Sequence, residues 1–469
     1  MKKLIGWCWV FWLLPLSALA QNYQILSQDL DGNRHGVTVI RVWGSHRDMG
    51  YAMGAAFADD IIEGLRQVKE KAGAGYAQLR SGMGITSWPV PGIADELFGM
   101  VEGIQFVRAD AKLDVTDLKI LNTFSDWGYA CRSHSCWGRY VQAPVKTLST
   151  RRLDFGTPFP AVLHHVLCAW EPSDGSPRFA NLAWPGYVAV ITGVNEYGTL
   201  VSLHDYNSDL ALQNGVVPRS IATRLALTGF SNVSLPDQLA WAEQQLSQIA
   251  VATGTFINFY APEGYAGVFT CPPGKACGAA RRPQPDYLFG EAIMTTNSQT
   301  DGHSVAGGGT FMDTYYQQGG PKDLQSHYDL MGHNGLHLLS LAYRGRGDMT
   351  IWFEGRSDSG VTPKVAVEWS ELFPAPSQDG GSDAGADAGM DAGNDGGTDT
   401  GADAASDGGA DPGLDAGTDA GADAGADSGA GDSFEPPADG GCGCGTGPGW
   451  FGLWLLPAVL WRWLCCRKG

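Results

Sequence analysis

The sequence is poor in basic residues. Its 469 residues include 31 Lys and Arg against 50 Asp and Glu, which gives a formal net charge of −19. Residues 376–440 hold 16 acidic residues and no Lys or Arg, whereas 21–375 hold 26 basic and 34 acidic residues. Neither stretch has a surplus of positive charge, so we expect no basic surface and no nucleic-acid partner.

Long apolar runs are also scarce, and those present lie at the two ends. Residues 4–16 are almost wholly apolar, follow Lys2 and Lys3, and lead to the small-residue site Ala18-Leu19-Ala20. This order is typical of a secretory signal over 1–20, cleaved before Gln21, and predicts an exported protein. An uncleaved membrane anchor is the alternative.

Residues 376–440 predict a disordered linker. Asp recurs at every fourth position from Asp379 to Asp427, with Gly and Ala filling most of the gaps. Such a segment has little to bury and repels itself, so it should be extended. A calcium-bound Asp-rich roll is the alternative, but those rolls need large apolar residues at fixed positions. Between 379 and 427 the only large apolar residues are Met390 and Leu414.

Residues 441–469 combine a Gly-Cys motif, an apolar run over 450–461 and a basic end. The run is shorter than the ~20 residues of a membrane-spanning helix. The order resembles the Cys-containing surface-sorting tails of myxobacteria. That resemblance implies processing by a sorting protease near Cys442 or Cys444. It also implies contact with the envelope membrane and a place at the cell surface or outer envelope, with or without later release. A zinc site from Cys442, Cys444, Cys465 and Cys466 is the alternative.

Common metal-protease and serine-hydrolase motifs are missing. The sequence has no His-Glu-x-x-His and no Gly-x-Ser-x-Gly, which argues against both classes. His327, His333 and His337 include one His-x-x-x-His spacing, but Gly335 interrupts the helix that it would need. We therefore predict neither a metal nor a cofactor.

Five cysteines lie in 21–375, and in an exported protein cysteines tend to pair. They are Cys131, Cys136, Cys168, Cys271 and Cys277. An odd number predicts one free thiol. Cys271 and Cys277 bound a compact loop that can close on itself, and pairing of Cys131 with Cys168 would leave Cys136 free. The connectivity stays open at this point.

Hydrophobic periodicity predicts an α+β fold, with helices towards both ends of 34–373 and strands between them. The expected helices are 47–72, 93–125, 217–250 and 329–343. The expected strands are 34–43, 136–155, 160–170, 180–204, 256–270, 349–353 and 365–369.

Cys136 is the candidate nucleophile. If 136–155 forms a hairpin with a two-residue turn at Ala143-Pro144, Cys136 faces Arg151, and a cation beside a thiol favours the thiolate. Asp154 then lies at the far end of the same strand, where it can orient an amine or the arginine. A surface Arg–Asp pair on an edge hairpin is the alternative. Cys131, twenty residues before Arg151, is the fallback nucleophile.

Two asparagines complete the pattern. Asn195 lies in the turn Gly193-Val194-Asn195-Glu196-Tyr197-Gly198, and Asn297 follows the expected strand 293–296. Two such amides can donate hydrogen bonds to a developing oxyanion. Asn is also common in turns for backbone reasons alone.

The sequence contains four motifs in this order: Cys136, Arg151-Arg152-Leu153-Asp154, the Asn195 turn and Thr296-Asn297. Together they resemble the N-terminal nucleophile (Ntn) hydrolases that cut linear amides. That group includes penicillin acyltransferase-type peptidases, choloylglycine hydrolases and acid ceramidase. The resemblance covers most of 34–373 and implies a four-layer αββα sandwich. It divides the chain into a helical pro-region over 21–135 and a catalytic region over 136–375. Two residues depart from the family pattern. The family has Thr or Ser where this chain has Trp137, and Asn where it has Arg152.

The resemblance also implies a mechanism. The chain would cut itself at Ser135-Cys136, and the freed amine of Cys136 would activate the thiol. Asn195 and Asn297 would hold the oxyanion while the thiol took the acyl group of a small-molecule amide. Hydrolysis or acyl transfer would follow. A surface-displayed binding protein with an inactive fold of this type is the alternative function.

Overall fold

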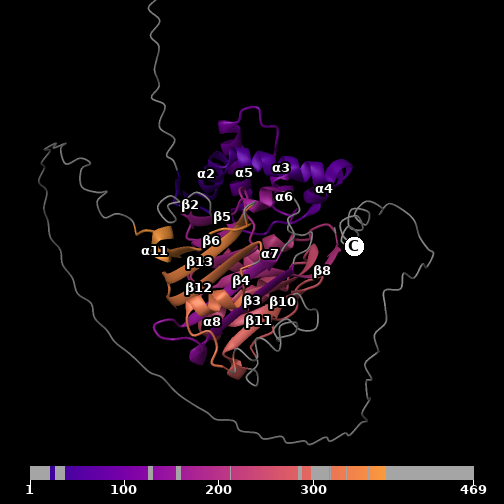
Figure 1. Cartoon of the computed structure of the whole chain (residues 1–469). Helices are drawn as coiled ribbons and strands as arrows, with labels where there is room; N and C mark the ends of the chain where they lie inside the picture. Colours follow the sequence, from indigo (N-terminus) through magenta and orange to yellow (C-terminus); the bar gives the residue numbers. More distant parts are fainter. Residues whose placement is uncertain are drawn as a thin grey trace, which may run out of the picture. The chain divides into compact units, whose positions relative to one another are not determined.

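The computed structural model describes the central part of the chain (Figure 1). No helix within that part is long and apolar enough to cross a membrane. The predicted signal, linker, sorting tail and Asn297 all lie outside the described residues. The structure describes 22–26, 37–124, 130–154, 160–211, 213–283, 288–296, 316, 318–333, 335–357 and 360–375.

Two β-sheets form the centre of the fold. The first sheet has eight strands in the order β1-β2-β5-β6-β7-β8-β9-β10. Its neighbouring strands run antiparallel, except for the parallel pair β2 and β5. Its strands are β1 Tyr23–Ile25, β2 Thr38–Gly44, β5 Val166–Pro172, β6 Phe179–Ala183, β7 Thr192–Asn195, β8 Leu200–Leu210, β9 Thr253–Tyr260 and β10 Ala266–Cys271.

The second sheet is antiparallel throughout and has the order β11-β3-β4-β12-β13-β14, with β15 also paired to β13. The strand β3 therefore lies inside the sheet, between β11 and β4. The strands are β3 Ala130–Trp137, β4 Thr147–Asp154, β11 Ala292–Thr296, β12 His337–Gly345, β13 Asp348–Ser357, β14 Gly360–Val361 and β15 Val365–Glu368.

The two sheets pack face to face through a shared apolar core. Leu167 and Ala180 of the first sheet belong to the same buried cluster as Leu339 and Ile351 of the second. Strand side chains alternate between faces, so these residues mark the inner face of each sheet. A polar contact also crosses the interface, because the hydroxyl of Tyr260 lies 2.9 Å from Ser133 Oγ.

Helices cover the outer faces of both sheets. On the first sheet, α2, α7 and α8 contact the strands directly, and α3 to α6 continue this layer. On the second sheet, α10 packs over β4 and β12. The predicted α+β class and four-layer order are confirmed. The helices are α2 His46–Ala56, α3 Ala58–Ala72, α4 Tyr76–Ile85, α5 Ile93–Val107, α6 Val115–Leu121, α7 Arg219–Thr228, α8 Leu235–Leu246, α10 Leu324–Leu330 and α11 Trp369–Leu372.

The helical layer on the first sheet is held by close backbone contact and by a buried ion pair. A Cβ atom on Gly50 of α2 would lie 2.0 Å from the carbonyl oxygen of Glu96, so only glycine lets α2 and α5 meet there. Glu96 of α5 is fully buried and receives two hydrogen bonds from Arg224 of α7, at 2.5 and 2.6 Å. His46 lies 2.8 Å from the same carboxylate. These contacts join the predicted pro-region to the region that follows it.

All four predicted helices differ from the structure. The helix expected over 93–125 is divided into α5 and α6, and the helix expected over 217–250 into α7 and α8. The helix expected over 47–72 is divided at Phe57 into α2 and α3. The helix expected over 329–343 is wrong, because α10 ends at Leu330 and 337–345 form β12. Leu339 and Leu341 point into the core between the sheets, while β12 pairs with β4 and β13 on its two sides. Strand pairing on both sides thus overrides the helical periodicity of this segment.

The cysteine predictions are partly confirmed. Cys271 and Cys277 form a disulfide, as their short loop predicts, and Cys131, Cys136 and Cys168 are free thiols. The expected Cys131–Cys168 pair is wrong. Cys168 lies near Glu96 and Arg224 on the helical side of the first sheet, whereas Cys131 belongs to the second sheet, so the first sheet separates the two thiols.

Candidate functional site

The register of β3 against β4 decides which cysteine meets Arg151. Arg151 lies opposite Ser133, and Cys136 lies opposite Leu148. The expected pairing of Cys136 with Arg151 is therefore wrong by three residues. The reason is the connection between the strands: β3 ends at Trp137 and β4 begins at Thr147, so the loop is much longer than the two-residue turn that we assumed.

Strand alternation separates Cys131 from Cys136. They are five residues apart on one strand, and an odd spacing puts two side chains on opposite faces of a sheet. Cys131 clusters with Leu153 in the larger apolar core, while Cys136 clusters with Leu148 in a small core on the α10 side. Arg151 is on the face of Cys131, since 131, 133 and 151 all point towards the first sheet.

The thiol in contact with Arg151 is thus Cys131. Arg151 is fully buried, and its Nη2 donates to the sulfur of Cys131 at 3.1 Å. The same nitrogen donates to the carbonyl oxygen of Leu203 on β8 at 3.1 Å, which fixes the guanidinium between the two sheets. Cys131 itself is only 5% exposed.

A histidine holds the other arm of the guanidinium. Arg151 Nη1 lies 3.0 Å from Nε2 of His337 on β12, and the hydroxyl of Thr192 on β7 lies 3.0 Å from the same nitrogen. Arginine can only donate, so Nε2 accepts and the proton of His337 is on Nδ1. Burial, together with the charge of Arg151 and the neighbouring His165, holds the pKa of His337 well below its usual value. The imidazole is therefore neutral.

The charges around Cys131 act in opposite directions on its pKa. Burial raises the pKa, and the nearby guanidinium of Arg151 only partly offsets this, so the pKa stays above its usual value. Asp154 raises it further and Arg219 lowers it. In the uncut chain the thiol is therefore protonated at neutral pH, and it needs a base before it can act as a nucleophile.

Asp154 stands at the start of β3, next to Cys131. It pairs with Ala130, one residue before Cys131 in the register. Its carboxylate forms ion pairs with two arginines and lies 2.6 Å from Nε of Arg152 and 3.7 Å from Nε of Arg132. An amine at residue 131 would therefore be one position along the strand from the residue that Asp154 faces.

The predicted processing site Ser135-Cys136 is inside the sheet. Ser135 pairs with Ser149 on one side and Ile293 on the other, and its hydroxyl lies 2.8 Å from Ser149 Oγ. Cys136 is fully buried, and burial raises the pKa of its thiol far above the usual value. The proposed boundary between 135 and 136 thus falls within β3.

Asn195 has a structural role in its turn. Its side-chain oxygen accepts from the backbone N–H of Tyr197 and Thr199, both at 3.1 Å, and its amide donates to Leu227 on α7 at 3.0 Å. The side chain thus faces the helices, whereas Thr192, three residues earlier, faces Arg151 through His337. The structure does not bring Asn195 to Cys131. No oxyanion donor from this turn is supported.

Comparisons with known proteins show a distant likeness in structure. No family model matches the sequence, and no curated protein matches it. Among solved structures, the chain is similar to the Caenorhabditis elegans N-acylethanolamine-hydrolyzing acid amidase (NAAA) ortholog, at 14% identity and a TM-score of 0.33. The match covers 45% of this chain and 92% of that one. A likeness at this level assigns no activity to the chain.

The sequence reasoning missed His337 and Thr192. The sequence predicts a helix at His337 and suggests that residue only as a metal ligand, and Thr192 belongs to no motif. A signal was nevertheless present: Arg151 is a charged residue inside a run of β-strand type, and a buried cation needs several acceptors from neighbouring strands. The neighbours were not known until the strand order was known.

Proposed function

We propose that this chain is a self-processing cysteine amidohydrolase or acyltransferase of the Ntn type, with Cys131 as its nucleophile. The observation that carries the proposal is the contact of the Cys131 thiol with the buried Arg151 guanidinium, near the start of β3, an inner strand of the second sheet. The order of motifs in the sequence supports the same class. The substrate class that it supports is a linear, non-peptide N-acyl amide.

Processing in this proposal occurs at Ala130-Cys131. The thiol of Cys131 attacks the carbonyl carbon of Ala130, the peptide C–N bond breaks, and the acyl group moves to sulfur while the nitrogen takes the thiol proton. Water then hydrolyses the thioester and leaves a carboxylate on Ala130 and a free amine on Cys131. This bond is at the first position of β3, whereas Ser135-Cys136 is paired on both sides.

The free amine supplies the base that the buried thiol lacks. An α-amine has a pKa of ~7.7–8.0, so it is largely able to accept a proton near neutral pH. It takes the proton of the Cys131 thiol, and Arg151 stabilises the thiolate. The thiolate attacks the substrate carbonyl, the amine product leaves with a proton, and a thioester remains. Water or a second amine then releases the acyl group. Asp154 is the group that would orient the new amine.

A turnover assay with matched variants tests the proposal. Purified wild-type chain is incubated with a panel of N-acyl amides that differ in acyl length, and the released amine is measured. We expect release by wild type and by Cys136→Ala, and none by Cys131→Ala. Activity that survives Cys131→Ala but is lost in Cys136→Ala would refute the assignment of the nucleophile.

The deep burial of Cys131 favours one other candidate function. A thiol that is 5% exposed is not open to substrate in the uncut chain. A surface-displayed binding protein with an inactive fold would keep this arrangement permanently. The two functions differ in one respect that is easily measured, because only the enzyme must expose the amine of residue 131.

We also propose that the protein is exported and held at the cell surface. The proposal rests on the features of 1–20 and 441–469 given above. Mass spectrometry of cell-envelope and medium fractions checks it: we expect the first chain of the processed protein to begin at Gln21 and the second to end near Cys442 or Cys444. A full-length chain confined to the cytoplasm would contradict it.

A further inference from the structure

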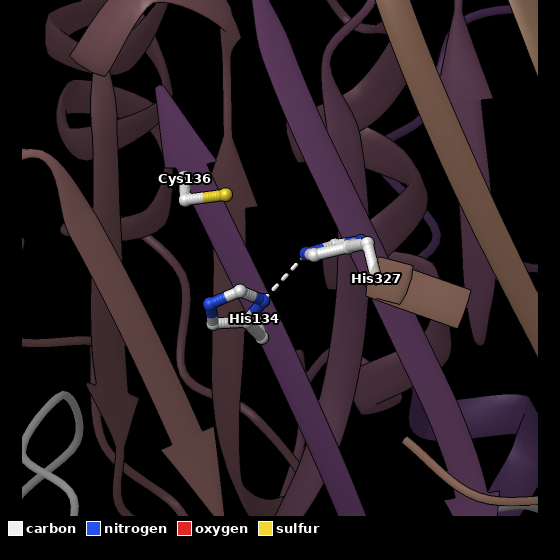
Figure 2. A group of neighbouring side chains, drawn as sticks. All are labelled: His134, Cys136 and His327. Atoms are coloured by element: carbon white, nitrogen blue, oxygen red, sulfur yellow. Dashed lines mark hydrogen bonds between the residues drawn. The ribbon is translucent and has the colours of Figure 1, made fainter. Parts of the chain in front are cut away.

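The other face of β3 carries a second group of chemically active side chains. His134 and Cys136 are two residues apart on the strand, so they point to the same side, and His327 of α10 packs above them. All three are fully buried, and one imidazole nitrogen from each histidine and the Cys136 sulfur lie within 4.8 Å of one another. Figure 2 shows the three side chains gathered around a common point.

The two imidazoles are in direct contact. Nδ1 of His134 is 2.5 Å from Nε2 of His327. Nδ1 of His327 has no hydrogen-bond partner among the described residues. A purely structural histidine pair in an apolar core would have its nitrogens better satisfied.

We propose that His134, Cys136 and His327 bind a zinc ion. Zinc prefers neutral imidazole and thiolate ligands, with Zn–N distances of ~2.0–2.1 Å and Zn–S of ~2.3 Å. In tetrahedral geometry those bond lengths place the ligand atoms ~3.3–3.6 Å apart. The spacings found here, from 2.5 Å up to at most 4.8 Å, bracket that range. Small side-chain rotations therefore suffice to centre an ion.

The remaining chemistry is consistent with this assignment. On binding, the Cys136 thiol releases its proton to solvent, and the thiolate and two neutral imidazoles coordinate the ion. The hydroxyl of Tyr316 hydrogen-bonds Nε2 of His134, the nitrogen that is not directed at His327. Such an outer contact fixes the ring and its tautomer, as is usual for zinc-bound histidines. A water molecule would take the fourth position.

The proposed ion has a structural role. Among the described residues, the outer layer on the second sheet rests mainly on α10, which has only seven residues. A helix of that length is marginal by itself. An ion shared by β3 and α10 would attach this helix to the sheet. Because Cys136 and Cys131 are on opposite faces, the zinc site is separate from the proposed nucleophile, and it does not depend on the proposed function.

Metal analysis of the untagged full-length protein tests the site. The protein is treated with a chelator, dialysed, reloaded with zinc or cobalt(II) and freed of excess metal. We compare wild type with Cys136→Ser and His327→Gln, and we use Cys131→Ser and His333→Ala as controls for a thiol and a histidine outside the cluster. His333 is on the surface, where it meets Asp329 and Glu354.

We expect wild type and both controls to bind one more zinc per chain than Cys136→Ser and His327→Gln. Subtracting the two variants also removes any zinc held by the C-terminal cysteines. The cobalt-loaded wild type should show a thiolate-to-cobalt charge-transfer band that Cys136→Ser lacks, and zinc should raise the melting temperature only where the site is intact. Equal zinc content in wild type and Cys136→Ser would overturn the proposal. If His327→Gln fails to fold, Cys136→Ser decides alone, since serine has nearly the size of cysteine.

Discussion

The buried ion pair between Glu96 and Arg224 gives the sharpest stability prediction. Glu96 is fully buried and Arg224 is 1% exposed, and the two groups share two short hydrogen bonds. Burial alone would raise the pKa of Glu96, but Arg224 and His46 outweigh it and the pKa is lowered. The carboxylate is therefore charged at neutral pH. Glu96→Gln would keep its shape while leaving the charge of Arg224 buried.

Removal of one partner from a buried ion pair costs ~3–5 kcal/mol. We expect the lower end for Glu96→Gln, about 3 kcal/mol, because Arg224 still donates to the carbonyl oxygen of Val188. Arg224→Met should cost less, since His46 remains beside the carboxylate at 2.8 Å. The double variant Glu96→Leu/Arg224→Met removes both charges and should recover most of the loss.

Denaturant unfolding of these variants provides the measurement. It is done in a Cys131→Ala background, so that processing does not change the chain during the experiment. A loss of 3 kcal/mol corresponds to a fall in melting temperature of roughly 4 °C for about 350 residues, at an unfolding entropy of ~2.1 cal/mol/K per residue. A change below about 1 kcal/mol in Glu96→Gln, or a double variant less stable than either single one, would refute the reasoning.

Three further predictions concern the site, the pH dependence and the disulfide. Arg151→Met should slow processing by ~10-fold or more, because one pKa unit at the Cys131 thiol is worth ~1.4 kcal/mol, and Arg151→Lys should restore part of the rate in a time course on gels. Burial lowers the pKa of His46 but its carboxylate partner raises it overall. The contribution of protonated His46 to the unfolding free energy should therefore be complete below a pH of about 6.5 and disappear as pH rises through the raised folded-state pKa. The difference in unfolding free energy between wild type and His46→Gln should then shrink at alkaline pH. Reduction of Cys271–Cys277, which closes a loop with a sequence separation of 6, should lower the unfolding free energy by about 2 kcal/mol; denaturation with and without reductant measures it.

The sequence predicted the class of fold and most of its elements. Alternating and periodic apolar residues located β2, the strands between 180 and 204, and the helical layer. The short spacing of Cys271 and Cys277 predicted their disulfide. These features depend on neighbours in the sequence, so local physical chemistry is enough to find them.

Features set by distant pairing were not predictable in the same way. The register of β3 depended on an assumed two-residue turn, and an error of three residues exchanged Cys131 for Cys136 beside Arg151. The apolar pattern of 337–343 predicts a helix, but this segment forms β12, which pairs with a strand on each side. The contact of His327 with His134 could not be predicted, because the two residues are 193 positions apart in the sequence and α10 brings them together.

Determination of the processing site tests the central claim most directly. Intact mass and N-terminal sequencing are applied to purified wild type, Cys131→Ala and Cys136→Ala. We predict two chains from wild type, the second beginning at Cys131, the same two from Cys136→Ala, and one uncut chain from Cys131→Ala. A second chain that begins at Cys136, or a wild-type chain that stays uncut on long incubation, would contradict the account.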